Sequence, residues 1–296
     1  MVIAKNKFSF GRMRLSVLKF FEVPIRYFSA HLAALSKIVK YRRYLEELNL
    51  SSRNDIYIST FMKSGTTWMQ MILYQLTSHG EMDFKHIYEI SPWLELYMER
   101  DQRIKFKSSL MFFKTHLDYR LFPRKFSGKF IVVLRNGMDA SVSQYHHFKD
   151  WGMPNLTFQE SFHKFFAGDS GHKNWFEYTR RWMENRKKLN ILYIKYEDLI
   201  ANFEEVLLKI ADFCGLSINE DEMPRILKKC SFDYMKLHED KFGAPRPNFD
   251  ILRNFIRIGK AGKGSTYYDD ELIRSYKKQF TKQLSKFELL REYMPD

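Results

Sequence analysis

The sequence predicts a three-layer α/β fold with a central parallel sheet and a P-loop-like loop that binds an anion. Segments with strand character alternate along the chain with longer segments of helical spacing, which is typical of a parallel sheet. Residues 130–134 are continuously apolar, as expected for a strand covered on both faces. Residues 55–76 combine a strand, a short polar loop and a helix, which together form the first half of a βαβ unit.

The first strand is expected at residues 55–60, where β-branched and aromatic side chains follow a polar turn. A loop of small and hydroxyl-bearing residues follows at residues 63–67. Behind this loop, apolar side chains recur at the spacing of a helix, at Trp68, Met69, Ile72, Leu73 and Leu76. The loop therefore joins the carboxyl end of a strand to the amino end of a helix.

The same two patterns predict the later elements. Strands are expected at residues 111–115, 129–134 and 191–194, and helices at about 138–149, 158–166, 175–188 and 202–213. Thr157 and Glu160 have the spacing of a capping box, and Asn202 and Gly215 suit the two ends of the last helix. No shift in composition divides the chain after residue 50, so we expect an extension over residues 1–50 and one domain over residues 51–296.

The chain is strongly basic: 49 Lys and Arg stand against 35 Asp and Glu in 296 residues, for a formal net charge of +14. Such an excess indicates an anionic partner, which could be nucleic acid, a membrane surface or a phosphorylated ligand. Two cysteines are too few for a disulfide framework and fit a reducing compartment, so we expect a cytoplasmic location. The longest stretch without a formal charge, residues 64–80, is too polar to span a membrane.

Half of the net charge lies in residues 1–50, which carry ten basic and three acidic side chains. Lys19, Glu22 and Arg26 interrupt any apolar core of a secretory signal in this basic segment. Its apolar and basic residues are interleaved, and two interpretations remain open. The segment is either a basic amphipathic helix on a membrane surface or a helix that packs its apolar side onto the domain.

The loop at residues 63–67 has the chemistry of an anion site. Backbone N–H groups converge between a strand and a helix, the helix N-terminus adds partial positive charge, and Lys63 adds a full charge. In the nucleoside-triphosphate P-loop the lysine follows the glycine, whereas here it precedes Gly65. Arg135 stands where magnesium-dependent P-loop enzymes usually have an Asp, and Asp139 is interpreted as a helix-start residue. We therefore expect a nucleotide-like anion bound without metal.

Six short motifs between about residues 53 and 290 resemble, in order and spacing, those of the cytosolic sulfotransferases. Residues 61–68, FMKSGTTW, are similar to the family's 5′-phosphosulfate loop, whose usual form is YPKSGTTW. Residues 114–116, KTH, are similar to the segment that contains its catalytic histidine. The other four are ISPWLE at residues 90–95, LRNGMDASVS at 134–143, YIKYED at 193–198 and FIRIGKAG at 255–262.

The resemblance implies transfer of a sulfuryl group from 3′-phosphoadenosine 5′-phosphosulfate (PAPS) to a hydroxyl or amine, with no metal. His116 would accept the acceptor's proton, Lys63 would stabilise the leaving oxygen, and Lys114 would assist at the transferring sulfonate. Arg135, Ser143, Arg257 and Gly259 would hold the 3′-phosphate, and Trp68 would stack on adenine. The full implied donor site is Lys63, Ser64, Gly65, Thr66, Thr67, Trp68, Arg135, Ser143, Tyr196, Cys230, Ser231, Phe232, Arg257 and Gly259.

The sequence departs from the family pattern at several positions. Ile258 stands where the family normally has a lysine and Cys230 where it has a threonine, so weaker donor binding is expected. Phe61 and Met62 replace a tyrosine and a proline at the entry to the loop. The family's dimerisation segment is not recognisable, so no dimer is assumed.

The acceptor is predicted only by class. An aromatic content of 17% suits an apolar pocket for a phenol, sterol or lipid-like molecule, although the same rings could simply fill the core. Residues 236–254 are interpreted as a mobile loop over the acceptor. No nucleic-acid partner is expected, and peripheral membrane contact through residues 1–50 remains open. Candidate acceptor-pocket residues are Phe84, Trp93, Tyr97 and Phe148, and His146 and His147 are helix-face residues near them.

Two rival functions are weighed against sulfuryl transfer. A metal-dependent, P-loop kinase-like enzyme is disfavoured because the lysine and the metal-binding aspartate of such enzymes are missing. A catalytically silent module that binds anions or membranes through the basic N-terminus is disfavoured because it would not need Lys63 and His116.

Overall fold

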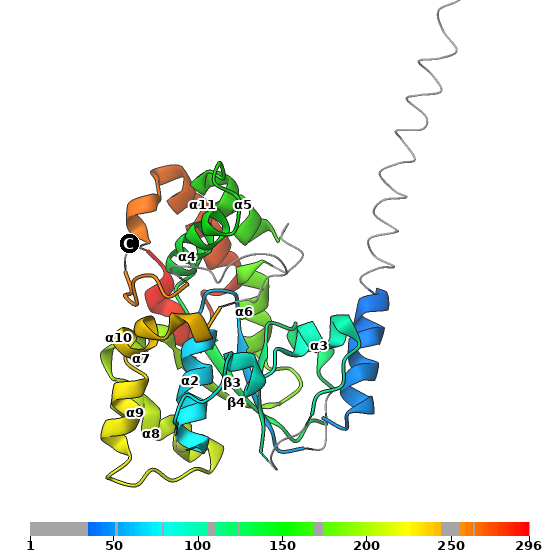
Figure 1. The fold of residues 1–296 in the computed structure, drawn as a ribbon. Helices are drawn as coiled ribbons and strands as arrows, with labels where there is room; N and C mark the ends of the chain where they lie inside the picture. Colours follow the sequence, from blue (N-terminus) through cyan, green and yellow to red (C-terminus); the bar gives the residue numbers. More distant parts are fainter. Residues whose placement is uncertain are drawn as a thin grey trace, which may run out of the picture.

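A four-stranded parallel sheet in the order β2-β1-β3-β4 forms the centre of the computed structural model (Figure 1). The structure describes residues 35–50, 53–78, 80–105, 110–123, 125–168, 174–243, 255–262 and 264–295. The strands are β1 (Ile56–Thr60), β2 (Phe112–Thr115), β3 (Lys129–Leu134) and β4 (Asn190–Lys195). The predicted α/β fold with a central parallel sheet is confirmed.

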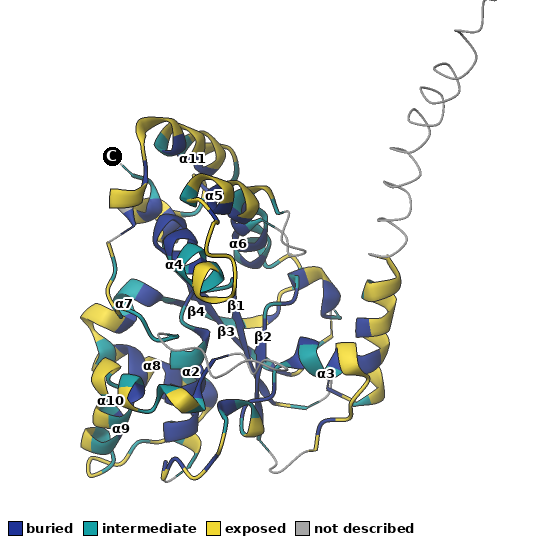
Figure 2. Cartoon of the chain, turned by 45° about the horizontal axis from the view of Figure 1, so that its top comes forward, coloured by how far each residue is buried: buried dark blue, intermediate teal, exposed yellow. Residues whose placement is uncertain are grey.

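Alternate residues of the strands face two separate hydrophobic cores. Ile58 of β1 and Ile131 of β3 belong to one core, whereas Tyr57 of β1 and Phe130 of β3 belong to the other. Every residue of β1 is buried, which follows from helices covering both faces of the sheet (Figure 2). β3 is therefore continuously apolar because both of its faces are covered, as the sequence predicted.

Two groups of helices supply the outer layers. The core that contains Ile58 includes side chains of α2 (Thr66–Thr77), α8 (Phe203–Cys214) and α9 (Met223–Lys229). The core that contains Tyr57 includes side chains of α3 (Leu94–Arg100), α4 (Gly137–Asp150), α5 (Phe158–Ala167), α6 (Trp175–Glu184) and α11 (Asp270–Gln283). The shorter elements are α7 (Tyr196–Ala201), α10 (Phe232–Leu237), η1 (Ile87–Glu89), η2 (Tyr119–Leu121), η3 (Glu239–Lys241), η4 (Ser265–Tyr267) and η5 (Glu288–Tyr293).

The observed helix ends agree with some of the capping residues and bounds predicted from the sequence and differ from others. Thr157 and Glu160 form the predicted capping box of α5, and Gly215 ends α8 with a φ of 74°. Asn202 precedes α8, but its side chain makes no capping hydrogen bond. The prediction of a helix over residues 175–188 was one turn too long, because Asn185 takes a left-handed conformation, φ 36°, and ends α6.

The described end of the predicted N-terminal extension packs on the domain. Residues 35–47 are helical, and Tyr41, Tyr44 and Leu45 are buried in the same core as Tyr57. The Tyr41 hydroxyl donates to Glu99 Oε1 at 2.9 Å at the end of α3. Residues 1–34 lie outside the described part of the chain, so the two interpretations of that stretch stay open.

Candidate functional site

A cavity of about 560 Å³ lies at the carboxyl ends of the strands. Lys63 follows β1, His116 follows β2, Arg135 follows β3 and Tyr196 follows β4, and all four line this cavity. Parallel strands end at the same edge of a sheet, so residues far apart in sequence meet there. The motifs singled out in the sequence are thereby brought to one site.

The loop between β1 and α2 has a backbone that needs glycine at one position. Gly65 has a φ of 93°, and a Cβ placed there would lie 2.7 Å from the ring of Tyr196. Lys63 also has a positive φ, 63°. Thr66 Oγ1 lies 2.6 Å from Thr60 Oγ1, which ties the start of α2 to the end of β1. These constraints fix the positions of Lys63 and Thr66 in the lining of the cavity.

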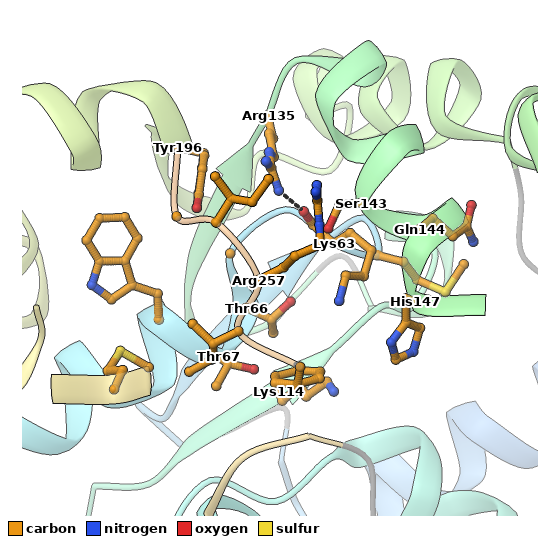
Figure 3. Close-up of a pocket in the computed structure, with 18 of the residues that line it drawn as sticks. Lys63, Thr66, Thr67, Lys114, Arg135, Ser143, Gln144, His147, Tyr196 and Arg257 are labelled. Carbon is orange, nitrogen blue, oxygen red and sulfur yellow. Dashed lines mark hydrogen bonds between the residues drawn. The ribbon is translucent and has the colours of Figure 1, made fainter. Parts of the chain in front are cut away.

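Four cations gather around the loop (Figure 3). Arg135 Nη1 donates to the Lys63 carbonyl at 2.7 Å, and its guanidinium lies 4.3 Å from the ring centroid of Tyr196. Burial, and then the charges of Arg135, Lys114 and Arg257, lower the pKa of the Lys63 ammonium to about 7. The pKa of Arg257 is also lowered, chiefly by burial. Such crowding of positive charge is unfavourable unless an anion binds among the cations.

The site fits a donor with several negative charges. Lys63, Lys114, Arg135, Arg257 and Lys260 line the cavity, and no Asp or Glu of the described chain is among its lining residues. The Arg135 Nε and Ser64 Oγ atoms are buried and have no hydrogen-bond partner within the described residues. Over the same residues, no three His, Cys, Asp or Glu side chains are grouped so that they could hold a metal ion. The unpaired Arg135 Nε and the five cations match phosphate and sulfonate oxygens.

His116 is held in one tautomer at the end of β2. Its Nδ1 lies 2.9 Å from the carbonyl oxygen of Thr60, which can only accept, so Nδ1 carries the proton. Nε2 then carries the lone pair, as a general base requires. The backbone N–H of His116 donates to the carboxylate of Glu95, and burial raises the pKa of Glu95 to about 7. Glu95 therefore fixes the position of the His116 backbone.

Lys114 lies in an aromatic cage beside His116. Its Nζ donates to Tyr88 Oη at 2.7 Å and lies 4.1 Å from the ring centroid of Trp93. Trp93 in turn meets His116 edge to face, with ring centroids 5.7 Å apart. The cage gives the ammonium one position next to the histidine.

The side of the cavity expected to hold adenine is built from three distant segments. Trp68 stacks on Phe203 at 5.5 Å between ring centroids, and its Nε1 donates to the Cys230 carbonyl at 2.9 Å. Gly259, with a φ of 63°, packs so closely on Phe232 that a Cβ would lie 2.1 Å from the ring. Residues 255–260 also line the cavity, so a segment far along the chain from Trp68 covers the same part of it.

Asp139 anchors that closing segment, which is more than its predicted role as a helix-start residue. It lies in the first turn of α4, as expected. Its Oδ2 accepts from the Gly262 N–H and its Oδ1 from the Gly264 N–H, both at 2.6 Å. One buried carboxylate therefore fixes the backbone next to Arg257 and Gly259.

The structure brings together all but two of the predicted site residues. Ser64 is buried behind the loop, and Ser231 caps α10 by accepting from the Tyr234 N–H at 3.2 Å; neither lines the cavity. Fourteen others do line it: His116, Lys63, Lys114, Gly65, Thr66, Thr67, Trp68, Arg135, Ser143, Tyr196, Cys230, Phe232, Arg257 and Gly259.

Some of the residues predicted for the acceptor pocket line the cavity, and others do not. Trp93, Phe148 and His147 line the cavity. Phe84 packs in the core against Tyr74, Tyr97 packs on the other core, and His146 lies 2.8 Å from Tyr267 Oη outside the cavity. In the predicted mobile loop, residues 236–243 include the end of α10 and η3, while residues 244–254 lie outside the described chain.

Several lining residues were not predicted. Gln144 lies on α4 beside His147 and Phe148, and Trp151 is the C-cap of that helix, so helical spacing from Ser143 could have found them. Ile256 and Lys260 lie inside the motif at residues 255–262, which could have drawn attention to them. No comparable signal exists for the other three, which are Tyr88 in η1, Leu96 in α3 and Met235 in α10.

Comparison with known proteins gives one consistent result. The family model described as "Sulfotransferase domain" matches residues 53–288. Mouse Sulfotransferase 1B1 is 30% identical over 252 residues, which cover 79% of this chain and 84% of that protein.

Solved structures agree with the sequence match. Mouse sulfotransferase SULT7A1 complexed with PAP aligns with a TM-score of 0.64 at 27% identity, covering 82% of this chain and 90% of that one. Retinol dehydratase in complex with androsterone and inactive cofactor PAP aligns with a TM-score of 0.65 over 83% and 86% of the two chains. At 20% identity the second likeness concerns the fold alone.

Proposed function

Because this chain belongs to the sulfotransferase family and is a sulfotransferase that uses PAPS as its donor, we propose that His116 is the general base of sulfuryl transfer to a small, apolar acceptor. The acceptor would present a hydroxyl or amine to His116. The observation that carries the proposal is the 2.9 Å contact between His116 Nδ1 and the Thr60 carbonyl, which leaves Nε2 as the proton-accepting atom.

The residues around the loop would bind the donor, which supplies the sulfuryl group when bound. Lys63, Gly65, Thr66 and Thr67 would surround its phosphosulfate, with Ser64 behind them. Arg135, Ser143, Arg257 and the Gly259 backbone would hold the 3′-phosphate. Trp68, Tyr196, Cys230 and Phe232 would form the purine side, and Ser231 would support it from outside the lining as the cap of α10. Support comes from the crowded cations and from the unpaired Arg135 Nε.

Three side chains would act on the reacting groups. His116 Nε2 would accept the proton of the acceptor hydroxyl as the new oxygen–sulfur bond forms. Lys63 would stabilise negative charge on the oxygen that leaves with the adenine nucleotide. Lys114, fixed by Tyr88 and Trp93, would stabilise charge on the sulfonate oxygens.

The test is a set of variants assayed with radiolabelled PAPS and a panel of phenols, sterols and amines. His116→Ala should lower kcat by about 100-fold or more, while PAP binding measured by calorimetry stays within twofold. Arg135→Ala should weaken PAP binding by roughly 2–3 kcal/mol, the contribution of lost charge-assisted contacts.

His163→Ala is the matched control, because His163 is exposed on α5 and does not line the cavity. It should leave kcat and PAP binding unchanged. Wild-type kcat in the His116→Ala variant would show that another group takes the proton.

We also propose a cytoplasmic enzyme whose residues 1–50 contact anionic membranes peripherally. None of the described helices is long and apolar enough to cross a bilayer. Support comes from the helix at residues 35–47, where Leu35 and Val39 are 56% and 65% exposed beside Lys40 and Arg43. The full chain should sediment with phosphatidylserine vesicles and not with phosphatidylcholine vesicles; equal sedimentation with both would refute this contact.

A further inference from the structure

His86 lies next to the cavity without being part of its lining. It is the N-cap residue of η1, and its ring meets the ring of Tyr88 edge to face, with centroids 4.4 Å apart. His86 is half-buried, and Tyr88 is one of the lining residues. Any effect of this histidine on the reaction must therefore pass through its neighbours.

Both ring nitrogens of His86 are hydrogen-bonded, and the two partners determine where its proton lies. The backbone N–H of Tyr88 can only donate, and its nitrogen lies 3.2 Å from Nδ1, so Nδ1 carries the lone pair. The carbonyl oxygen of Gly243 can only accept, and it lies 2.8 Å from Nε2, so Nε2 carries the proton. Burial lowers the pKa of His86, in keeping with this neutral tautomer.

The segment that carries Gly243 is fixed to the segment of His86 by a second contact. Lys241 Nζ donates to the carbonyl oxygens of Met82 and Phe84, at 2.9 Å and 2.7 Å. The two segments are thus joined at two points. The Gly243 carbonyl is thereby held where it keeps the proton on Nε2 and leaves Nδ1 as an acceptor.

Tyr88 connects His86 to the reacting groups. Its hydroxyl accepts from Lys114 Nζ at 2.7 Å, and the same ammonium lies 4.9 Å from the centroid of the Tyr88 ring. Tyr88 lies in η1, which is only three residues long, so few backbone hydrogen bonds hold it. The bond from its N–H to His86 fixes the start of this turn and with it the tyrosine that holds Lys114.

We propose that His86 is a positioning residue for Lys114: by accepting from the Tyr88 N–H, it holds the tyrosine whose hydroxyl places the Lys114 ammonium beside the sulfonate that is transferred. Its bond to Gly243 selects the tautomer that can accept. This inference rests on the proposed function, in which Lys114 stabilises charge on the sulfonate oxygens.

Three substitutions at His86, assayed with PAPS and the best acceptor of the panel, test this role. His86→Ala removes the bond to Tyr88, so kcat should fall by about tenfold, while KM for PAPS and PAP affinity stay within about twofold. His86→Asn should keep kcat within about twofold of wild type, because an Asn carbonyl oxygen accepts from the N–H two residues on. His86→Gln, whose longer amide reaches Gly243 instead, should behave like His86→Ala.

A double-mutant cycle shows whether His86 acts through Tyr88. Tyr88→Phe removes the hydroxyl that holds Lys114 and should also lower kcat by about tenfold. Adding His86→Ala to Tyr88→Phe should lower kcat by less than a further factor of about two, because the connection is already broken. A loss of packing at His86 would instead add to the effect of Tyr88→Phe, and the smaller Asn would not restore it.

His238→Ala is the matched control. His238 is also half-buried and lies 4.5 Å from a tyrosine ring, that of Tyr234, but neither residue lines the cavity. This variant should keep the kcat and PAP affinity of the wild type. Melting temperatures verify that all variants are folded.

Nitrogen-15 NMR of histidine-labelled enzyme gives a readout that does not require turnover. The His86 signals, assigned by their loss in His86→Asn, should show a protonated Nε2 and an unprotonated Nδ1 at neutral pH. A proton on Nδ1 would overturn the inference. So would a wild-type kcat in both His86→Ala and His86→Gln, or additive losses in the double-mutant cycle.

Lys114→Met separates this inference from the proposed function. A loss of kcat in Lys114→Met that His86→Ala and His86→Gln do not share refutes the inference alone. Wild-type kcat in Lys114→Met refutes the role proposed for Lys114, and the inference with it. Wild-type kcat in His116→Ala refutes the proposed base and leaves the inference standing.

Discussion

Lys63 is the residue whose protonation depends most directly on what fills the cavity. Its pKa near 7 has two causes, burial and the neighbouring charges of Arg135, Lys114 and Arg257. A donor with negative phosphate and sulfonate groups would reverse both effects, because it pairs with the ammonium and offsets the other cations. Binding of the donor should therefore be coupled to protonation of Lys63.

That coupling has a definite sign. The free enzyme loses the Lys63 proton as pH rises above about 7, whereas the complex keeps it, so binding takes up a proton. PAP affinity should accordingly fall by up to about tenfold per pH unit between pH 8 and pH 9. Calorimetry in two buffers of different ionisation enthalpy measures the proton uptake.

Lys63→Met should abolish both the proton uptake and the slope, while Lys260→Met, at an exposed position of the same cavity, should keep them. Identical slopes in the wild-type enzyme and Lys63→Met would contradict this assignment.

Some residues of the site could be predicted from the sequence, and others could not. Lys63, His116 and Arg135 could be predicted because each follows a strand, and parallel strands end at one edge of the sheet. Tyr88 could not, because it lies in a short turn, η1, and only the folded chain brings its hydroxyl 2.7 Å from Lys114. Glu95 was visible only as part of a motif, and its contact with the His116 backbone depends on how α3 meets β2.

Among the elements, predictions were most accurate where side-chain periodicity and local caps agreed. α5 was expected at 158–166 and spans Phe158–Ala167, because its capping box and its apolar face define the same helix. The end of α6 was missed because Asn185 ends the helix in a left-handed conformation, which the apolar spacing does not reveal. Residues 255–262 and 264, the described part of the segment before η4, have no regular structure, so their position depends on tertiary contacts.

Asp139 is the contact that makes this segment part of the donor site. Asp139→Asn keeps the size of the side chain but removes its charge, and it places an amide donor against a backbone N–H. PAP affinity should fall roughly 10- to 100-fold, the equivalent of one or two charge-assisted hydrogen bonds, with a smaller change in kcat. Calorimetry and initial rates at saturating PAPS separate the two effects.

Asp270→Asn is the matched control, because Asp270 also lies in the first turn of a helix, α11, but is exposed. It reproduces the loss of the helix-dipole interaction without touching the segment at residues 255–264. Equal PAP affinity in the two variants would show that Asp139 acts only on α4.

Across the whole molecule, the excess of basic residues is found in two separate regions. Lys63, Lys114, Arg135 and Arg257 account for part of it at the cavity, and residues 1–50 carry half of the net charge outside the family match at 53–288. The sequence could not decide whether that first segment packs on the domain, because a buried amphipathic helix and a membrane-bound one share the same pattern. The contacts of its described end show that residues 35–50 pack on the domain, while Leu35 and Val39 on the same helix stay exposed.

Those contacts imply that the cooperatively folding unit begins before residue 51. Leu45 is 1% exposed in the core that also contains Tyr57, so Leu45→Ala should lower the free energy of unfolding by about 2–5 kcal/mol, the usual cost of such a truncation. Leu35→Ala, on the same helix at 56% exposure, should change it by less than about 0.5 kcal/mol. Urea denaturation followed by fluorescence and circular dichroism should show one shared transition in both variants. A Leu45→Ala protein as stable as the wild type would instead identify residues 35–50 as an appendage, because a helix that contributes to the core cannot lose a buried leucine without cost.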